Sequence, residues 1–320
     1  MRTIVSLLAL AATLLGAALP VAAQTYPSGA ITLVIPLAPG DGTDVAGRAM
    51  AEELSKLLKV AVVPVNRPGG GMAIGTDSVV KAKKDGYTIL ITPNAALVSG
   101  RILNPDTVLY DPVKDLTYLG GTTRTPVILT VRGDAWKTLP ELVEFAKKNP
   151  GKVRAASVGP GSIGHFSVEM VNALTGAGIT HVPFKGGGPG MTALLGGHVE
   201  LGAFSVGATA GHLRSGAMRG LVVSSKSPVF PEIPTMPELG YRQNLPGIWF
   251  AFYGPAGLPA EVTKVLVAAI EKIVKDPAVA TKLAPFGMVQ EYNAPEKVVA
   301  EIREEQRVLE DLARKAGLAK

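Results

Sequence analysis

The chain contains no cysteine, and this absence removes several kinds of chemistry at once. Without thiols there is no disulfide, no thiol nucleophile and no cysteine-ligated metal, so the fold depends on its hydrophobic core. Charged residues are also scarce, at 18% of the chain, whereas hydrophobic residues make up 47%. This balance is typical of a globular protein and excludes a disordered one.

Basic residues exceed acidic ones, with a formal net charge of +6, but they are scattered. The exceptions are the short run Lys81-Ala82-Lys83-Lys84 and the C-terminal segment. Such dispersed charge favours solvated faces over a polyanion site, so we expect no nucleic-acid partner.

Long apolar runs are confined to the N-terminus. Met1-Arg2 gives a positive start, Ile4 to Leu19 is almost entirely apolar, and Val21-Ala22-Ala23 offers small residues for signal peptidase. This pattern predicts a signal peptide over residues 1–23, cleaved near Ala23, and export to the periplasm. A membrane anchor is the alternative, but the run is short for a span and no second stretch of about 18 apolar residues follows.

Short apolar strands alternate with helical patterns along the rest of the chain. The first set has strands at Ile31–Ile35, Val60–Val65 and Tyr87–Ile91, with helices at Asp44–Leu58 and Ile74–Lys84. A second set runs from Val127 to Ser224, and long helices follow at Ala260–Lys275 and Pro295–Lys315. This alternation predicts an α/β fold with mainly parallel sheets flanked by helices.

The two sets of alternating strands and helices each span about a hundred residues, and this predicts two lobes. We assign residues 24–124 and 228–320 to a discontinuous lobe 1, since the terminal helices should pack back on it, and residues 125–227 to lobe 2. The chain should cross between the lobes near Gly121–Pro126 and Ser225–Pro234.

Three glycine-rich loops each follow a predicted strand and precede a helix: Pro39–Asp44, Gly159–His165 and Lys185–Gly190. In open α/β sheets, ligands bind at the carboxyl ends of strands, where helix N-termini present backbone N–H groups. Glycine lets these amides approach a bound oxygen closely, and the helix dipole favours an anion. The loops therefore predict a carboxylate site without a dedicated arginine; the alternative is that the glycines merely form turns.

Enzymatic interpretations of these loops lack essential partners. Gly159-x-Gly161-x-x-Gly164 matches the dinucleotide fingerprint, but no acid lies about 20 residues later. Ser162 and His165 have no acid to orient the imidazole, and His165 with Glu169 lacks a third metal ligand. We therefore expect no catalytic residue, metal or cofactor, and interpret Ser162 as a helix N-cap or an oxygen-binding hydroxyl. His181, His198 and His212 look isolated and are expected to be structural or exposed.

Two aspartates of the first loop, Asp41 and Asp44, are expected to have different roles. Asp44 and Arg48 form an i, i+4 pair, and a first-turn acid stabilised by the helix dipole is favoured over a ligand contact. Asp41 at the loop tip either faces solvent or pairs with a ligand ammonium, and the sequence does not choose between them.

Together the motifs resemble those of the tripartite tricarboxylate transporter receptors, also called Bug proteins, from Tyr26 to Gly317. The matching segments are Ile35–Asp44 with Arg48, Asn66–Gly71 with Gly75, Asp85–Thr88, Tyr110–Asp115, Gly161-Ser162 with His165, His181–Gly186 and Pro255–Pro259. The resemblance implies a periplasmic-binding-protein fold, a two-lobed "Venus flytrap" that closes around a small organic carboxylate. It also implies delivery of this ligand to two integral-membrane transporter subunits.

The resemblance further implies that the first loop and the Gly161-Ser162 loop hold a ligand carboxylate, while the loop after Phe184 forms the other wall. The predicted ligand-binding residues are Ala38, Pro39, Gly40, Asp41, Gly42, Thr43, Asn94, Gly161, Ser162, His165, Lys185, Gly186, Gly187, Phe204 and Ser205. Many relatives carry an acidic pair where this chain has Ala203-Phe204-Ser205. We therefore expect a ligand without an amino group, with any apolar body packed against Phe204.

Two other functions remain as alternatives to a transport receptor. A ligand-sensing partner of a two-component sensor kinase would use the same fold with a different downstream protein. An exported hydrolase is disfavoured because no triad or metal set is evident. We expect the protein to act as a monomer.

Overall fold

The computed structural model describes residues 26–40, 42–103, 105–184, 186–227, 229–315 and 317. The predicted signal peptide lies outside the described residues. Within them, no helix combines the length and the apolar character that crossing a membrane requires.

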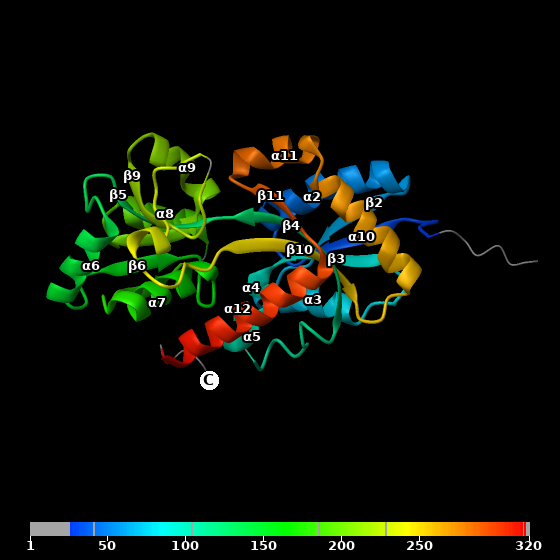
Figure 1. Ribbon diagram of the computed structural model, residues 1–320, viewed down its shortest axis with the longest axis horizontal. Helices are drawn as coiled ribbons and strands as arrows, with labels where there is room; N and C mark the ends of the chain where they lie inside the picture. The colour runs from blue at the N-terminus through cyan, green and yellow to red at the C-terminus, as the bar shows by residue number, and fades with distance from the viewer. Residues whose placement is uncertain are drawn as a thin grey trace, which may run out of the picture.

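The chain forms two separate β-sheets, which lie side by side along the long axis (Figure 1). The first has the order β11-β4-β10-β3-β1-β2, with strands Ile31–Ile35 (β1), Val62–Asn66 (β2), Thr88–Pro93 (β3), Leu116–Thr125 (β4), Ile248–Pro255 (β10) and Val289–Asn293 (β11). The second has the order β7-β6-β8-β5-β9, with strands Val127–Arg132 (β5), Arg154–Ser157 (β6), Thr180–Pro183 (β7), Leu201–Ser205 (β8) and Met218–Val223 (β9).

Helices cover both sheets. Those beside the first sheet are Gly42–Leu58 (α2), Ala73–Val80 (α3), Asn94–Leu97 (α4), Ser99–Leu103 (α5), Ala260–Val274 (α10), Pro277–Leu283 (α11) and Pro295–Lys315 (α12). Those beside the second are Leu139–Lys148 (α6), Ile163–Thr175 (α7), Gly187–Leu195 (α8) and Val206–Arg214 (α9). Three short 3₁₀ turns among the described residues are Gly70–Met72 (η1), Pro237–Leu239 (η2) and Ala284–Phe286 (η3).

The predicted α/β architecture with helix-flanked sheets is confirmed. Both sheets are mixed: most strands of each run in one direction, and a minority oppose them. β10 runs antiparallel to both β3 and β4, and β5 runs antiparallel to both β8 and β9. The antiparallel strands arise because the chain leaves the first sheet through β4, enters the second through β5, and later returns through β10. We propose the lobe limits stated above on this basis, since the described strands of each sheet come from one lobe, apart from the last residue of β4, Thr125.

Local sequence signals explain where key helices begin and end. The Thr138 hydroxyl accepts a hydrogen bond from the Glu141 amide at the start of α6, and the Ser162 hydroxyl does the same for His165 at the start of α7. Gly176 ends α7 in the left-handed conformation, with φ 69°. These are the preferred N-cap and C-cap residues of α-helices.

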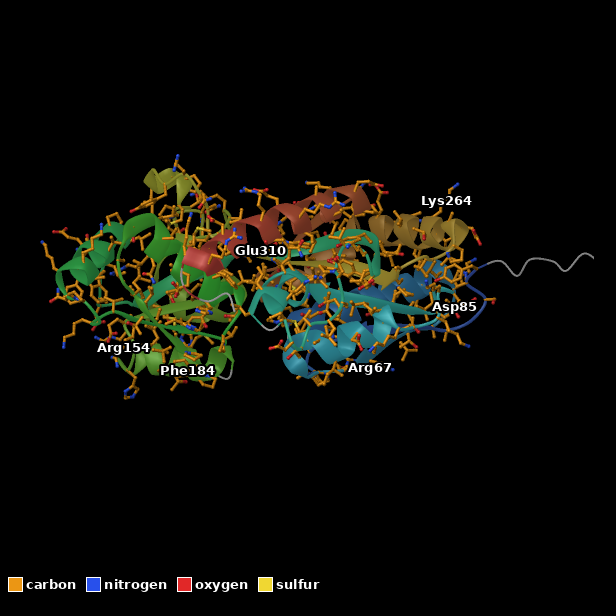
Figure 2. The ribbon with its side chains drawn as sticks, turned by 90° about the horizontal axis from the view of Figure 1, so that it is seen from below. Arg67, Asp85, Arg154, Phe184, Lys264 and Glu310 are labelled. Carbon is orange, nitrogen blue, oxygen red and sulfur yellow. The ribbon has the colours of Figure 1, made fainter. Side chains whose placement is uncertain are left out.

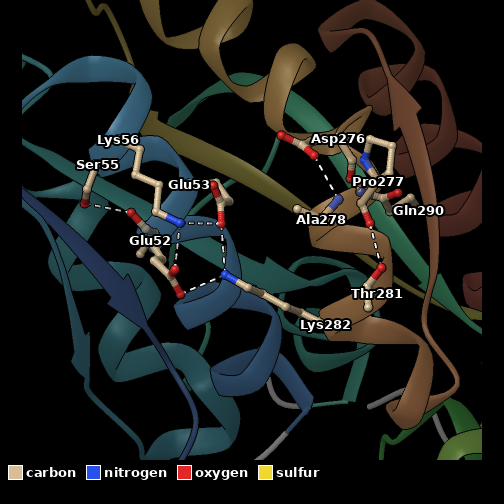
Figure 3. A network of polar contacts seen from close by, with 11 residues as sticks. Glu52, Glu53, Ser55, Lys56, Asp276, Pro277, Ala278, Thr281, Lys282 and Gln290 are labelled. Carbon is tan, nitrogen blue, oxygen red and sulfur yellow. Dashed lines mark hydrogen bonds and ion pairs between the residues drawn. The ribbon is translucent and has the colours of Figure 1, made fainter.

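Apolar residues of the strands and helices pack into large clusters, one of which joins β1, α2 and α10. Figure 3 shows an ion-pair network on the surface above it, where Lys282 of α11 binds Glu52 and Glu53 of α2 at 2.8 and 2.9 Å. The α12 helix runs along the first sheet and packs against α7 of the second. The two sheets are thus connected by packed helices as well as by the crossing strands.

Candidate functional site

The strand directions place the candidate loops on two edges that face each other. β5 begins where β4 ends, and β6, β7 and β8 all run toward the start of β5. In the first sheet, β1 and β3 run parallel to β4, because β3 and β4 are both antiparallel to β10. The loops after β1 and β3 therefore point toward the loops after β6, β7 and β8.

The side chains labelled in Figure 2 agree with these strand directions when they are followed along the long axis. Arg154 at the start of β6 lies toward one end of the molecule, and Phe184, just after β7, lies nearer the middle. Arg67, just after β2, is next, and Asp85, just before β3, lies toward the opposite end. The carboxyl ends of β2 and β7 thus lie toward the middle of the molecule, and ligands of open α/β sheets bind at the carboxyl ends of strands.

Backbone contacts bring the two edges together at two points. A Cβ at Gly207, in the first turn of α9, would collide with the carbonyl oxygen of Phe286 in η3. A Cβ at Gly161 would lie 3.0 Å from Cδ1 of Leu103 in α5. Gly161 and Gly207 lie beside the second sheet, whereas Leu103 and Phe286 lie beside the first. The absence of a side chain at these two glycines therefore permits close approach of the lobes.

The first loop is held by a buried carboxylate. Asp44, 4% exposed, accepts hydrogen bonds of 2.9 Å from the Gly40 amide, from Nε of Arg48 and from Nδ2 of Asn66. Nδ2 of Asn66 also donates to the carbonyl of Leu37 at 2.9 Å. Asp44 therefore shapes the loop from inside, which agrees with a structural role for the Asp44–Arg48 pair.

The surroundings of Asp44 stabilise its charged form. Burial favours a higher pKa for this carboxyl, but the hydrogen bonds from Arg48, Gly40 and Asn66 outweigh it and lower the pKa below its ordinary value. Asn66 was absent from the predicted site, although it lies in a segment that carries the family resemblance. Its contact with Asp44 spans 22 residues, so sequence spacing gave no sign of it.

The predicted ligand residues of this loop are distributed between surface and core. Ala38, Pro39 and Gly40 are exposed, Gly42 is half-buried and Thr43 is buried. Asp41 lies outside the described residues. The exposed stretch is therefore Ala38 to Gly40, immediately before the N-terminus of α2.

In the second lobe, the loop from Gly159 to Ser162 is tied down by its own hydrogen bonds. The amides of Gly159, Gly161 and Ser162 donate to Oγ of Ser157, Nδ1 of His165 and the carbonyl of Gly159. The amides of Ile163 and Gly164, in the first turn of α7, have no intrahelical acceptor because of their position. These two amides, not that of Gly161, are the donors that the turn leaves for an anion.

His165 and His181 lie together, contrary to the expectation that His181 is isolated. Their rings stack with centroids 3.7 Å apart and planes inclined by 15°. The strand β7 carries His181 beside β6, and α7 returns over the same edge, so residues 16 apart in sequence meet. Among the described residues, no group of three His, Asp or Glu side chains is placed to hold a metal ion.

The helices after β7 and β8 also begin at this edge. Gly186 precedes α8 with φ 110°, and Gly187 is the first residue of that helix. Ser205 caps α9, accepting a hydrogen bond of 3.3 Å from the Ala208 amide. Lys185 lies outside the described residues.

Phe204 is 2% exposed and packs in the core below α8. Its ring lies so close to Gly190 and Gly202 that a Cβ at either position would collide with it. A buried ring offers no surface to a ligand in this conformation. The placement of Phe204 therefore does not support the predicted apolar contact, and Ser205 is the member of this pair that reaches the edge.

Asn94 follows β3 at the same edge, but it is fully buried. Its Nδ2 donates to the carbonyl of Gly247 at 3.0 Å and to Oε1 of Glu305 at 2.6 Å, and its Oδ1 accepts from the Trp249 amide at 3.3 Å. These contacts use both Nδ2 hydrogens and one acceptor position of Oδ1. Asn94 thus joins β3 to β10 and α12 in this structure.

Comparison with known proteins places this arrangement in a family. Residues 46–318 match the family described as Tripartite tricarboxylate transporter family receptor. The chain is 34% identical to the protein BugT of Bordetella pertussis over 306 residues, which cover 94% of each chain. The chain belongs to this receptor family. As a member of a family of transport receptors, the protein is a binding protein and not an enzyme, so the hydrolase alternative is wrong.

Solved structures of similar proteins contain carboxylates. An R. palustris protein with adipate has a TM-score of 0.80 and 28% identity, covering 92% of this receptor and 99% of that chain. The protein MatC of Rhodopseudomonas palustris, with bound malate, has a TM-score of 0.77 and 28% identity, covering 90% of this receptor and 99% of that chain. These similarities confirm the periplasmic-binding-protein fold.

A separate cavity of about 680 Å³ lies beside β9, away from the facing edges of the receptor. Its lining includes Lys137, Arg214, Phe230 and Glu232. None of the predicted ligand residues borders it, and it is not part of the candidate site.

Proposed function

We propose that this receptor captures a small organic carboxylate between the facing edges of its two sheets and passes it to integral-membrane transporter subunits. The observation that carries the proposal is the convergence of three helix N-termini, those of α7, α8 and α9, on the edge that faces the first loop. Helix N-termini present amide donors and partial positive charge, which favour an anion. The adipate and malate held by structural relatives support the same ligand class.

We infer that the ligand class excludes amino acids. An amino acid carries an ammonium group, and burying that charge without a partner costs several kcal/mol. In the described first loop, the carboxylate of Asp44 is buried and already accepts three hydrogen bonds. Ser205 contributes a hydroxyl, not a carboxylate, on the opposite edge. We infer a mono- or dicarboxylate without an amino group.

Calorimetric titration with succinate and aspartate, at one pH and salt concentration, tests this inference because the two acids differ by the amino group alone. We expect succinate to bind more tightly. Tighter binding of aspartate, removed by Asp41→Asn, would contradict the inference and identify Asp41 as the ammonium partner.

A further inference from the structure

A stacked pair of imidazoles lies directly beneath the Gly159–Ser162 loop. His165 is 5% exposed, and its Nδ1 accepts the Gly161 amide at 3.2 Å. His181 stacks on its face and places Nε2 2.6 Å from Oγ of Ser157. Ser157 in turn accepts the Gly159 amide and the Ser162 hydroxyl at 3.2 and 3.3 Å. The pair therefore contacts the loop through Gly161 and, by way of Ser157, through Gly159 and Ser162.

This geometry requires His165 to be neutral. Because Nδ1 accepts a hydrogen bond, the ring proton must reside on Nε2, which lies 3.8 Å from Oε1 of Glu169. A second proton, on Nδ1, would remove the acceptor of the Gly161 N–H and point toward that N–H. It would also place a positive charge against the face of the His181 ring. Protonation of His165 is thus incompatible with the observed loop.

The surroundings keep both rings neutral at ordinary pH. Burial lowers the pKa of His165, and burial together with repulsion from His165 lowers the pKa of His181 to about 4. The carboxylate of Glu169 lies 3.8 Å from Nε2 of His165. Burial raises the pKa of Glu169, so this carboxylate is a weakened counter-ion for a protonated imidazole. Phe166, the other ring beside His165, carries no charge.

We propose that His165 is a positioning residue: stacked in its neutral form on His181, it holds the Gly159–Ser162 loop so that the first turn of α7 presents its amides, and acidification releases that loop. The consequence for ligand affinity rests on the proposed function. The role of His165 in holding the loop does not.

The sign of the pH dependence separates this role from direct ligand contact. An imidazolium that touched a ligand carboxylate would strengthen binding as the pH falls. A neutral imidazole that holds the loop predicts weaker binding on acidification, because the protonated ring loses the Gly161 hydrogen bond. Since Nδ1 already accepts that amide and His165 is nearly fully buried, the structure favours the second sign.

Nitrogen-15 NMR of the imidazoles in the ligand-free protein tests the loop role without any ligand. We expect His165 to be the neutral Nε2–H tautomer at pH 8, and the Gly161 amide to lose protection from hydrogen exchange as the pair titrates. A proton on Nδ1 at pH 8, or a Gly161 amide unaffected by the titration, would overturn the proposal.

Two substitutions of the same residue extend the test to binding, with succinate as the probe. His165→Asn places an oxygen near the position of Nδ1 and does not titrate, whereas His165→Phe keeps a ring but removes the acceptor. We expect His165→Phe to weaken binding at pH 8 by about tenfold, the equivalent of one hydrogen bond, and His165→Asn to restore most of the loss. His198→Asn, at an exposed histidine, is the matched control.

Between pH 8 and pH 4, the range over which the lowered pKa values of His165 and His181 place their titration, the wild-type affinity should fall further than that of His165→Asn. The ratio of the two affinities cancels the titration of succinate itself. Equal pH profiles, or full affinity in His165→Phe, would overturn the role of His165 in binding. If succinate, malate and adipate all fail to bind the wild type, the proposed function fails, and the NMR experiment still decides whether His165 positions the loop.

Discussion

The indole Nε1 of Trp249 donates a hydrogen bond of 2.9 Å to Oε2 of Glu305. The other carboxylate oxygen accepts from Nδ2 of Asn94 at 2.6 Å. One side chain of α12 thereby joins the start of β10 to the end of β3, close to the place where the chain crosses between the sheets. Burial raises the pKa of Glu305 to about 7 despite these two donors.

Replacing Glu305 with alanine should destabilise the protein by about 2–4 kcal/mol, because it leaves two buried donors without acceptors. The neighbouring Glu304, exposed and paired with Arg307, is the control, and Glu304→Ala should cost less than about 1 kcal/mol. Urea unfolding monitored by tryptophan fluorescence measures both. Equal losses in the two variants would show that the Glu305 contacts contribute little.

The stability contributed by Glu305 should also depend on pH. Its folded pKa lies above the unfolded value, so the folded state holds the proton more tightly, and the contribution present at low pH decreases as the pH rises toward 7. The stability difference between wild type and Glu305→Ala should therefore be larger at pH 5 than at pH 8. A difference that grows from pH 5 to pH 8 would contradict the raised pKa.

Asp44→Asn should weaken ligand binding and lower stability by about 1.5–3 kcal/mol, since a carboxylate that accepts three hydrogen bonds is replaced by an amide with one acceptor. The folded pKa of Asp44 is depressed, so its contribution is present above the unfolded pKa of about 3.9 and is lost as the pH falls below it. Asp77→Asn, at a surface acid paired with Lys81, is the control. Calorimetric titration and thermal unfolding of both variants check the prediction, which fails if they behave alike.

Ser162→Ala should reduce both stability and affinity, each by about 0.5–1.5 kcal/mol, through loss of the α7 cap and the contact with Ser157. Thr138 caps α6 with the same geometry at a site remote from the facing edges. Thr138→Ala should therefore lose similar stability and retain full affinity. If both variants bind ligand normally, the N-terminus of α7 is not part of the site.

Gly207→Ala should keep the lobes apart, because the added Cβ would collide with the backbone of Phe286. We expect affinity to fall by at least about tenfold and the radius of gyration with ligand to exceed that of the wild type. Gly211→Ala is the control in the same helix, where a Cβ meets no atom within 4 Å and alanine favours the helix. Wild-type affinity in Gly207→Ala would show that this contact is unnecessary for binding.

The parts of the fold with strong local patterns were predictable from the sequence. The strand at Ile31–Ile35 and the helix at Pro295–Lys315 have the predicted bounds, because the apolar pattern of each is clear. The strand β4 was missed since its segment, LTYLGGTTRT, lacks alternation and pairs with β10, more than 120 residues away. The helix α9 was missed because its two glycines lower helix propensity.

The candidate site was predictable as a set of loops, but not as a set of contacts. Glycine-rich loops after strands could be placed at one edge by the rule for open α/β sheets. The pairing of Asn66 with Asp44, the stacking of His181 on His165 and the burial of Phe204 depend on tertiary packing, which leaves no trace in sequence spacing.

The most direct test of the receptor function is calorimetric melting of the purified protein with succinate, malate and adipate, each over a range of concentrations. A ligand that binds the folded state alone should add about 2.7 kcal/mol of stability at 100 times its dissociation constant. We predict such stabilisation by at least one of these acids, with saturation at one ligand per chain. No stabilisation by any of them would contradict capture of a small carboxylate at the facing edges.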